Sequence, residues 1–203
     1  MGAVSRRGRF IVFEGIDGSG KSEQVRRLAT WLRAERHAVV STREPTDGEW
    51  GRTYRAWGRG EFEAAPDEVL GWFLADRREH VAGVIRPALE RGEVVVCDRY
   101  RDSTRAYQAA QGIDRVRLRE LFAAAEFPEP DLVLWLRVPV ATALARMGKA
   151  AEERFERADF LFRVDAEYER LGLTPLDASG DPDAVERAVR ARVERVLGDA
   201  VVP

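Results

Sequence analysis

The sequence has little lysine, a single cysteine and no long apolar run. Arginine carries nearly all of the positive charge, because Lys21 and Lys149 are the only lysines. Cys97 has no second cysteine with which to form a disulfide, and one thiol cannot support a cysteine-rich metal cluster. The apolar runs at 94–97 and 132–136 are far shorter than the roughly 20 residues of a membrane-spanning helix. With no signal-like apolar stretch near the start, these features predict a cytoplasmic protein without a membrane partner.

A large net charge is missing as well. Lysine and arginine together number 33 and aspartate and glutamate 35, which leaves a formal net charge of -2. This balance gives no global field that would draw the chain to nucleic acid, so an anionic ligand requires a local basic pocket. The 203 residues, 45% of them hydrophobic, can bury one core, and we expect a single domain over residues 1–203.

Short apolar runs alternate with stretches of helical spacing along the chain. The expected strands are 10–13, 37–42, 94–98, 132–138 and 174–177. The expected helices are 25–32, 66–90, 115–125, 141–147, 159–171 and one that begins at Pro182. This alternation predicts an α/β fold, a three-layer sandwich in which a five-stranded parallel sheet carries helices on both faces. Ligands of such sheets bind at the carboxyl ends of the strands.

A glycine-rich segment follows the first expected strand and precedes a helix. It reads Gly15-Ile16-Asp17-Gly18-Ser19-Gly20-Lys21-Ser22 and matches the pattern G-x-x-x-x-G-K-[ST] of a phosphate loop, or P-loop. Its glycines let backbone N–H groups surround phosphate oxygens at a helix N-terminus. Lys21 is expected to reach the β- and γ-phosphates of ATP, and the Ser22 hydroxyl to bind Mg²⁺. The loop alone leaves open whether the chain is a switch, an ATPase or a kinase.

Several further segments resemble, in order and approximate spacing, the thymidylate kinase family of P-loop nucleoside monophosphate kinases. They are FIVFEGIDG (10–18), TREP (42–45), FLADR (73–77), IRPAL (85–89), DRY (98–100), ST (103–104), AYQ (106–108), PDLVL (130–134) and DAS (177–179). The resemblance implies transfer of the γ-phosphate of ATP to dTMP, giving dTDP and ADP, with Mg²⁺ as the cofactor. It also implies a homodimer built on helix faces.

Charged residues of these segments fit a site that holds two anionic nucleotides. Asp98 follows four apolar residues at the end of a strand, where a carboxylate can order the water shell of Mg²⁺ together with Ser22. Arg99 and Arg43 can grip the phosphate of the acceptor bidentately. Lys21, Asp98 and Arg99 are therefore candidate catalytic residues.

Recognition of the acceptor is inferred from the resemblance. It implies that Phe73 stacks on thymine and that Arg77 donates to its O4 atom, which disfavours cytosine because the cytosine amino group is itself a donor. Thr104 and Gln108 are implied at the N3 edge of the base, and Tyr100 at the 2′ position of the sugar. Asp17 resembles the family carboxylate that reaches the 3′-hydroxyl of the acceptor.

Residues 148–158 are rich in charge and poor in apolar side chains, and we expect them to form a short mobile lid. Some family members carry an arginine in the phosphate loop where this chain has Gly18. Members without that arginine supply one from the lid, which implies Arg154 at the transition state. Arg146, just before the lid, is expected to pack near the adenine.

The chain departs from the family pattern at three places. Glu23 stands where the family usually carries Thr or Ser against the α-phosphate, and its carboxylate repels phosphate unless it turns away. Thr46-Asp47-Gly48 replaces Gly-Gly-Thr, and Arg137 replaces a frequent Asp. These departures keep three alternatives open. They are a kinase for another pyrimidine or deoxynucleoside monophosphate, a P-loop switch that is not a kinase, and a nucleotide binder without turnover.

Overall fold

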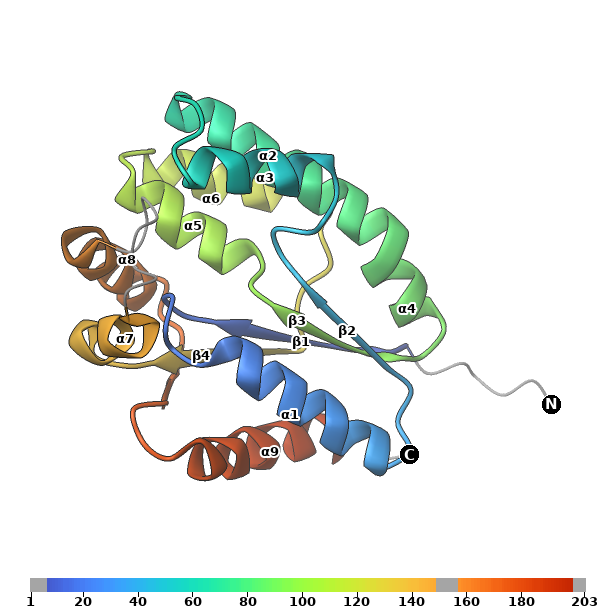
Figure 1. Ribbon diagram of the computed structural model, residues 1–203. Helices are drawn as coiled ribbons and strands as arrows, with labels where there is room; N and C mark the ends of the chain where they lie inside the picture. Colours follow the sequence, from blue (N-terminus) through green and yellow to red (C-terminus); the bar gives the residue numbers. More distant parts are fainter. Residues whose placement is uncertain (1–6, 149–156, 199–203) are drawn as a thin grey trace.

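The computed structural model describes residues 7–148 and 157–198. Five parallel strands form its centre (Figure 1). They are β1 (Arg9–Glu14), β2 (Val39–Arg43), β3 (Val94–Asp98), β4 (Leu132–Arg137) and β5 (Pro175–Asp177), in the spatial order β2-β3-β1-β4-β5. The helices are α1 (Lys21–Ala34), α2 (Glu49–Gly58), α3 (Pro66–His80), the π-helical η1 (Val81–Ile85), α4 (Arg86–Glu90), α5 (Arg101–Ala110), α6 (Arg115–Ala124), α7 (Val140–Met147), α8 (Ala158–Arg170) and α9 (Pro182–Gly198).

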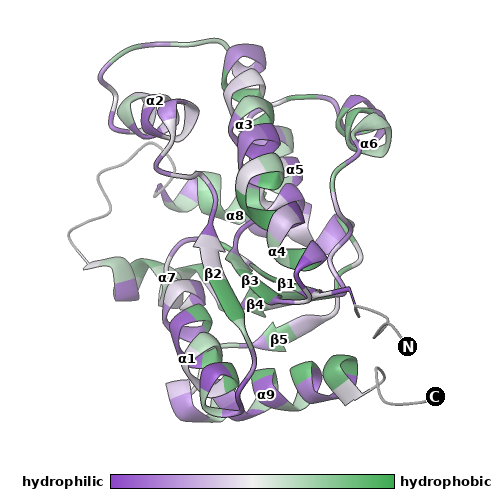
Figure 2. Cartoon of the chain, turned by 90° about the vertical axis from the view of Figure 1, so that its right-hand side faces the viewer, coloured by the Kyte–Doolittle hydropathy of each residue, from purple (hydrophilic) through white to green (hydrophobic). Residues whose placement is uncertain are grey.

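Helices cover both faces of the sheet, so the predicted three-layer α/β architecture is confirmed. Helices α1 and α9 contact each other beneath the sheet in Figure 1, and η1, α4, α3 and α5 lie above it. The side chains of β1 alternate between the faces, since Phe10 and Val12 pack with η1 and α4 while Ile11 and Phe13 pack in the core that includes α1 and α9. Figure 2 shows the apolar strands enclosed between these helical layers.

The expected helix at 66–90 is one continuous helical segment, but its middle is wound more widely. The π-helical turn η1 separates α3 from α4. It lies directly before Arg86-Pro87, and a proline ring has no N–H and clashes with the carbonyl four residues earlier. A wider turn removes that clash without ending the segment.

Two helices were not expected from the sequence. Helix α2 buries Trp57 against α3, and α5 follows directly on the turn after β3. Within the described parts of the chain, no helix has both the length and the apolar character needed to cross a bilayer.

The order of the strands places three loops side by side. Phe13 of β1 pairs with Asp98 of β3, and Asp98 pairs with Arg43 of β2. The segments that follow these residues therefore leave the sheet at the same edge, on the left of Figure 1. This edge carries the phosphate loop, the 44–48 loop and the turn at 98–100.

The packing of α9 gives a first testable prediction. Val189 is fully buried, and replacing it with Ala removes two methyl groups and leaves a cavity, which we expect to lower the free energy of unfolding by about 2 kcal/mol in urea titrations. Val116→Ala is the matched control, because Val116 is 47% exposed and its truncation should cost less than about 0.5 kcal/mol. Equal losses in both variants would contradict this placement of α9.

Candidate active site

The loop from Gly15 to Gly20 closes tightly between β1 and α1. Gly15 has φ +140°, and a Cβ atom there would lie 2.4 Å from the carbonyl oxygen of Leu136 on β4. Only glycine fits so close to a neighbouring backbone. Gly18 and Gly20 also have positive φ, and Gly20 caps the N-terminus of α1 in the left-handed conformation. The strand, loop and helix of the predicted phosphate loop are thus all present.

Lys21 is the first residue of α1, and its ammonium group folds back over the loop. Its Nζ donates to the carbonyl oxygen of Ile16 at 2.7 Å and to Ser19 Oγ at 3.4 Å. Burial, followed by the positive charge of Arg99, lowers the pKa of Lys21 to about 8. A buried ammonium group at a helix N-terminus is well suited to bind an anion, which would favour its charged form.

Ser22 and Asp98 meet at the end of β3. Ser22 Oγ donates to Asp98 Oδ2 at 2.6 Å, while Asp98 Oδ1 is buried and has no hydrogen-bond partner in the described chain. A buried, unsatisfied carboxylate oxygen beside a hydroxyl fits Mg²⁺, which often binds few protein oxygens and completes its octahedron with water and phosphate. Among residues 7–148 and 157–198, no three Asp, Glu, His or Cys side chains gather as a metal site.

Arg43 lines the same hollow as Ser22 and Asp98, a space of about 400 Å³. Its guanidinium donates to Asp47 Oδ1 at 2.8 Å and is largely exposed. The hollow therefore has a carboxylate and a hydroxyl at its base and an arginine at its rim.

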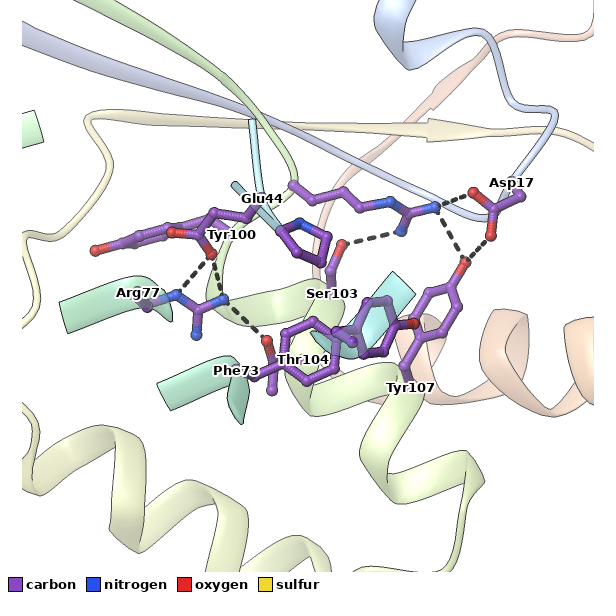
Figure 3. Close-up of a pocket in the computed structure, with 11 residues that line it drawn as sticks. Asp17, Glu44, Phe73, Arg77, Tyr100, Ser103, Thr104 and Tyr107 are labelled. Atoms are coloured by element: carbon purple, nitrogen blue, oxygen red, sulfur yellow. Dashed lines mark hydrogen bonds and ion pairs between the residues drawn. The ribbon is translucent and has the colours of Figure 1, made fainter. Parts of the chain in front are cut away.

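Arg99 connects the phosphate loop to α5. Its Nη2 donates to Asp17 Oδ1 at 2.5 Å and to the Tyr107 hydroxyl at 3.1 Å, and its Nη1 donates to Ser103 Oγ at 3.2 Å and to the Gly15 carbonyl at 3.1 Å. Figure 3 shows this cluster at one end of a cavity. Arg99 also has φ +68°, which is rare for a residue with a Cβ atom.

Asp17 accepts from both partners of this cluster. The Tyr107 hydroxyl donates to its Oδ2 at 2.8 Å, so each carboxylate oxygen is engaged. Burial acts to raise the pKa of Asp17, but the charges of Arg99 and Lys21 and its hydrogen bonds outweigh burial and lower the pKa below its usual value. Asp17 is therefore an ionised acceptor at neutral pH, directed toward the cavity.

A cavity of about 170 Å³ lies between α2, α3 and α5 (Figure 3). Its lining residues are Asp17, Glu44, Pro45, Tyr54, Phe73, Arg77, Arg99, Tyr100, Ser103, Thr104 and Tyr107. Aromatic rings form much of its wall, and the centroids of Tyr54 and Phe73 are 4.4 Å apart. One end of the cavity carries the Arg99 cluster and the other carries Arg77.

Arg77 is 1% exposed and is held by the carboxylate of Glu44. Its Nε and Nη2 donate to Glu44 Oε2 at 2.8 and 2.6 Å, and Nη2 also donates to Thr104 Oγ1 at 2.9 Å. Glu44 Oε1 in turn lies 2.9 Å from His80 Nδ1. These contacts leave Arg77 Nη1 as a buried donor without a partner in the described chain. A buried donor of this kind costs free energy unless a ligand accepts its hydrogen bond.

A further hollow of about 320 Å³ lies beside the phosphate loop. Arg146 of α7 and Glu23 of α1 line it, together with Gly20 and the loop before α9. Arg146 Nη2 donates to the carbonyl oxygen of Ser179 at 3.1 Å. This hollow adjoins the end of the loop from which a nucleoside bound through its phosphates would extend.

The Glu23 carboxylate turns away from the phosphate loop. Its oxygens accept hydrogen bonds from Arg26 at 2.7 and 3.0 Å and from Arg27 at 2.6 Å. These bonds lower the pKa of Glu23 to about 2, so it is ionised and paired at neutral pH. Arg27 also bonds Asp183 and Glu186 of α9. The expected repulsion of phosphate is thus reduced by two guanidinium groups.

The structure brings most of the predicted site residues to one edge of the sheet. Asp17, Phe73, Arg77, Arg99, Tyr100 and Thr104 line the cavity, Arg43, Ser22 and Asp98 line the hollow beside it, and Arg146 lines the hollow beyond the loop. Gln108 is fully buried in α5 but is not among the cavity-lining residues, and neither of its amide atoms has a partner in the described chain. Arg154 and residues 149–156 of the predicted lid lie outside the described residues.

Five lining residues were not assigned from the sequence, namely Glu44, Pro45, Tyr54, Ser103 and Tyr107. Ser103 and Tyr107 share one face of α5 with Tyr100 and Thr104, at the spacing i, i+3, i+4 and i+7. Recognition of residues 101–110 as a helix would have identified that face. Tyr54 has a similar signal, because Trp50, Tyr54 and Trp57 stand at the spacing i, i+4 and i+7 of a helix face.

Comparisons with known proteins agree with this geometry. A family model described as thymidylate kinase matches residues 13–189. The chain belongs to the thymidylate kinase family. The thymidylate kinase of Akkermansia muciniphila is 43% identical over 197 residues, which cover 95% of this chain and 92% of that protein. The thymidylate kinases of Xanthomonas campestris pv. campestris and Desulfotalea psychrophila are 44% and 38% identical, over 95% and 94% of this chain and 86% and 96% of theirs.

The other two departures from the family pattern also have structural partners. Thr46 donates through its backbone N–H and its hydroxyl to Asp76 of α3, at 2.8 and 2.5 Å. Arg137 pairs with Asp165 and Glu169 of α8. Thr46 therefore connects the 44–48 loop to α3, and Arg137 connects β4 to α8.

The close approach of Gly15 to β4 can be tested by substitution. Gly15→Ala places a methyl group against the Leu136 carbonyl and should lower the affinity for ATP by at least about tenfold in calorimetry, because the loop must move away from the strand. Gly60→Ala is the matched control, since Gly60 also has positive φ but has open space around it. It should cost about 1 kcal/mol of stability and leave ATP affinity unchanged. Unchanged ATP affinity in Gly15→Ala would contradict the loop geometry.

Proposed function

We propose that the protein transfers the γ-phosphate of ATP to dTMP, giving dTDP and ADP. The observation that carries the proposal is the cavity that has the Arg77 guanidinium at one end and Arg99 at the other. A nucleoside monophosphate has a base and a phosphate at opposite ends, and the phosphate loop lies next to the Arg99 end. Family membership supports the same activity.

Phosphoryl transfer requires positioning and positive charge more than it requires an acid or a base. In the proposed complex the phosphate loop and Lys21 hold the donor triphosphate, while Arg99 and Arg43 hold the acceptor phosphate. Ser22 and Asp98 would hold Mg²⁺, which would offset the negative charge of the donor phosphates. Arg146 contacts the adenosine from its hollow beyond the loop.

Recognition of thymine follows from the donor at the closed end of the cavity. The Arg77 guanidinium can donate to the O4 atom of thymine, whereas the amino group of cytosine would oppose one donor with another. Phe73 supplies the stacking surface, with Thr104 nearby. Asp17 receives the 3′-hydroxyl of the sugar, and Tyr107 joins Tyr100 as a ring near the sugar because its hydroxyl bonds that carboxylate.

A homodimer is proposed from the family resemblance, and a cytoplasmic location from the short apolar runs. The lid expected at 148–158 stays a prediction, because residues 149–156 lie outside the described residues. A P-loop switch and a kinase for another monophosphate are the alternatives that the following assay separates.

Acceptor selectivity is tested by release of ADP from MgATP in the presence of dTMP, dUMP, dCMP, UMP, AMP and dGMP. We expect dTMP to give the highest kcat/KM and to exceed dCMP at least about hundredfold, because dCMP leaves the Arg77 donor unpaired.

Lys21→Met should abolish diphosphate formation while the melting temperature stays close to wild type. Acceptor-independent release of ADP points to a switch, and full activity of Lys21→Met rules out the proposed donor site.

The role of Arg154 is tested separately. Arg154→Ala should lower kcat by at least about tenfold with little change in the KM of either nucleotide, because a group that acts only in the transition state contributes nothing to ground-state binding. Arg187→Ala on the exposed side of α9 is the control and should leave kcat unchanged. A decrease of less than tenfold would mean that another group offsets the transition-state charge.

A further inference from the structure

Glu14 is an ionisable side chain beneath the active site that the proposed mechanism does not use. It is the last residue of β1 and is fully buried, directly before the phosphate loop. Hydrophobic side chains would fill such a position at no electrostatic cost, and buried carboxylates persist only where donors surround them. The donors around Glu14 therefore indicate what it does.

One oxygen of Glu14 holds the backbone of the turn at 98–100. The Tyr100 N–H donates to Glu14 Oε1 at 3.0 Å, and the adjacent Arg99 N–H donates to the carbonyl oxygen of Phe13 at 2.8 Å. Arg99 lies between these two bonds at φ +68°, a conformation that is sterically unfavourable for arginine and persists only where its surroundings fix it. The two bonds tie the turn to the end of β1 on either side of the strained peptide.

The other oxygen of Glu14 is bonded to side chains of two helices. Ser103 of α5 and the Tyr168 hydroxyl of α8 both donate to Oε2, the latter at 3.0 Å, and their hydroxyls lie 2.8 Å apart. Ser103 Oγ also accepts from Arg99 Nη1 at 3.2 Å. Glu14 thus reaches Arg99 by two routes, through the backbone and through Ser103.

We propose that Glu14 is a positioning residue that fixes the strained turn at Arg99, and with it the direction of the Arg99 guanidinium toward the acceptor phosphate. The inference rests on the proposed function in that Arg99 receives the acceptor. Glu14 itself touches no substrate. Glu14 also accepts a hydrogen bond from Tyr168, so α8, the helix that follows the predicted lid, belongs to the same hydrogen-bond network.

Burial disfavours the ionised form of Glu14, and the groups around it act on its pKa in both directions. Burial, and then the charge of Asp102, raise the pKa of Glu14 to about 7, while the Ser103 bond and the charge of Arg99 act to lower it. Lys21 and Arg77 are further cations whose charges interact with it. The pKa of Glu14 in the folded protein lies above its ordinary value of 4.5. Glu14 therefore contributes to folding stability below about pH 4.5, and this contribution is lost as the pH rises through about 7.

The experiment compares wild type with Glu14→Gln at pH 8. The amide keeps the shape and one acceptor oxygen, but neutral hydrogen bonds replace charge-assisted ones. We expect the KM for dTMP to rise roughly tenfold and the KM for ATP to change less than about twofold, since the proposed ligand of the Arg99 guanidinium is the acceptor phosphate. Glu194→Gln, on an exposed position of α9, is the control and should alter neither KM.

A readout independent of turnover is hydrogen exchange of the Tyr100 amide, which should become roughly tenfold faster in Glu14→Gln as its bond weakens. Tyr168→Phe removes one donor from the same carboxylate and should raise the KM for dTMP about two- to threefold. Unchanged Tyr100 exchange together with an unchanged KM for dTMP overturns the inference, and so does an equal rise of both KM values with a lower melting temperature. If wild type fails to phosphorylate dTMP, the proposed function is wrong, and the exchange measurement still decides the role of Glu14.

Discussion

The pairing of β1 with β3 is the constraint on which the active site depends. Phe13 lies opposite Asp98, so the phosphate loop and the turn that carries Arg99 leave the sheet at the same level. Parallel pairing with β2 on the other side of β3 brings Arg43 to that level too. Because the side-chain period of a strand is two, a shift of one residue would move Asp98 out of reach of Ser22 and reverse every core-facing side chain. Both faces of β1 are apolar and buried, so polar contacts at the strand ends, such as the bond from the Tyr100 N–H to Glu14, favour this register.

Much of the fold followed from local patterns. The phosphate loop was evident because its glycines, lysine and serine have fixed spacing between a strand and a helix, and the apolar strands were short and distinct. The wide turn η1 was not evident, although Pro87 marks its position, because proline disfavours an ordinary turn without specifying which alternative replaces it. Helix α2 was not predicted, although Trp50, Tyr54 and Trp57 stand at helical spacing and Trp57 is buried in the core.

The roles of individual residues were harder to predict from the sequence than the location of the site. The donor set of Arg77 depends on Glu44, which lies 33 residues earlier, and no local pattern joins them. Glu23 looked unfavourable in the sequence because the pairing of Arg27 with α9 is a contact over 156 residues. Ser103 and Tyr107 stood in a recognised segment without an assigned role, since the segment was not identified as a helix. Charge pairs of this kind are specified by tertiary packing and become visible only with the structure.

Lys21 is unusual among the cations of the site because its proton is held weakly. The arginines around it stay charged at any physiological pH, whereas the pKa of Lys21 is about 8. A bound triphosphate favours the ammonium form, so nucleotide binding above that pH draws a proton from the solution. The heat released on binding in alkaline solution will therefore include the ionisation enthalpy of whichever buffer donates that proton.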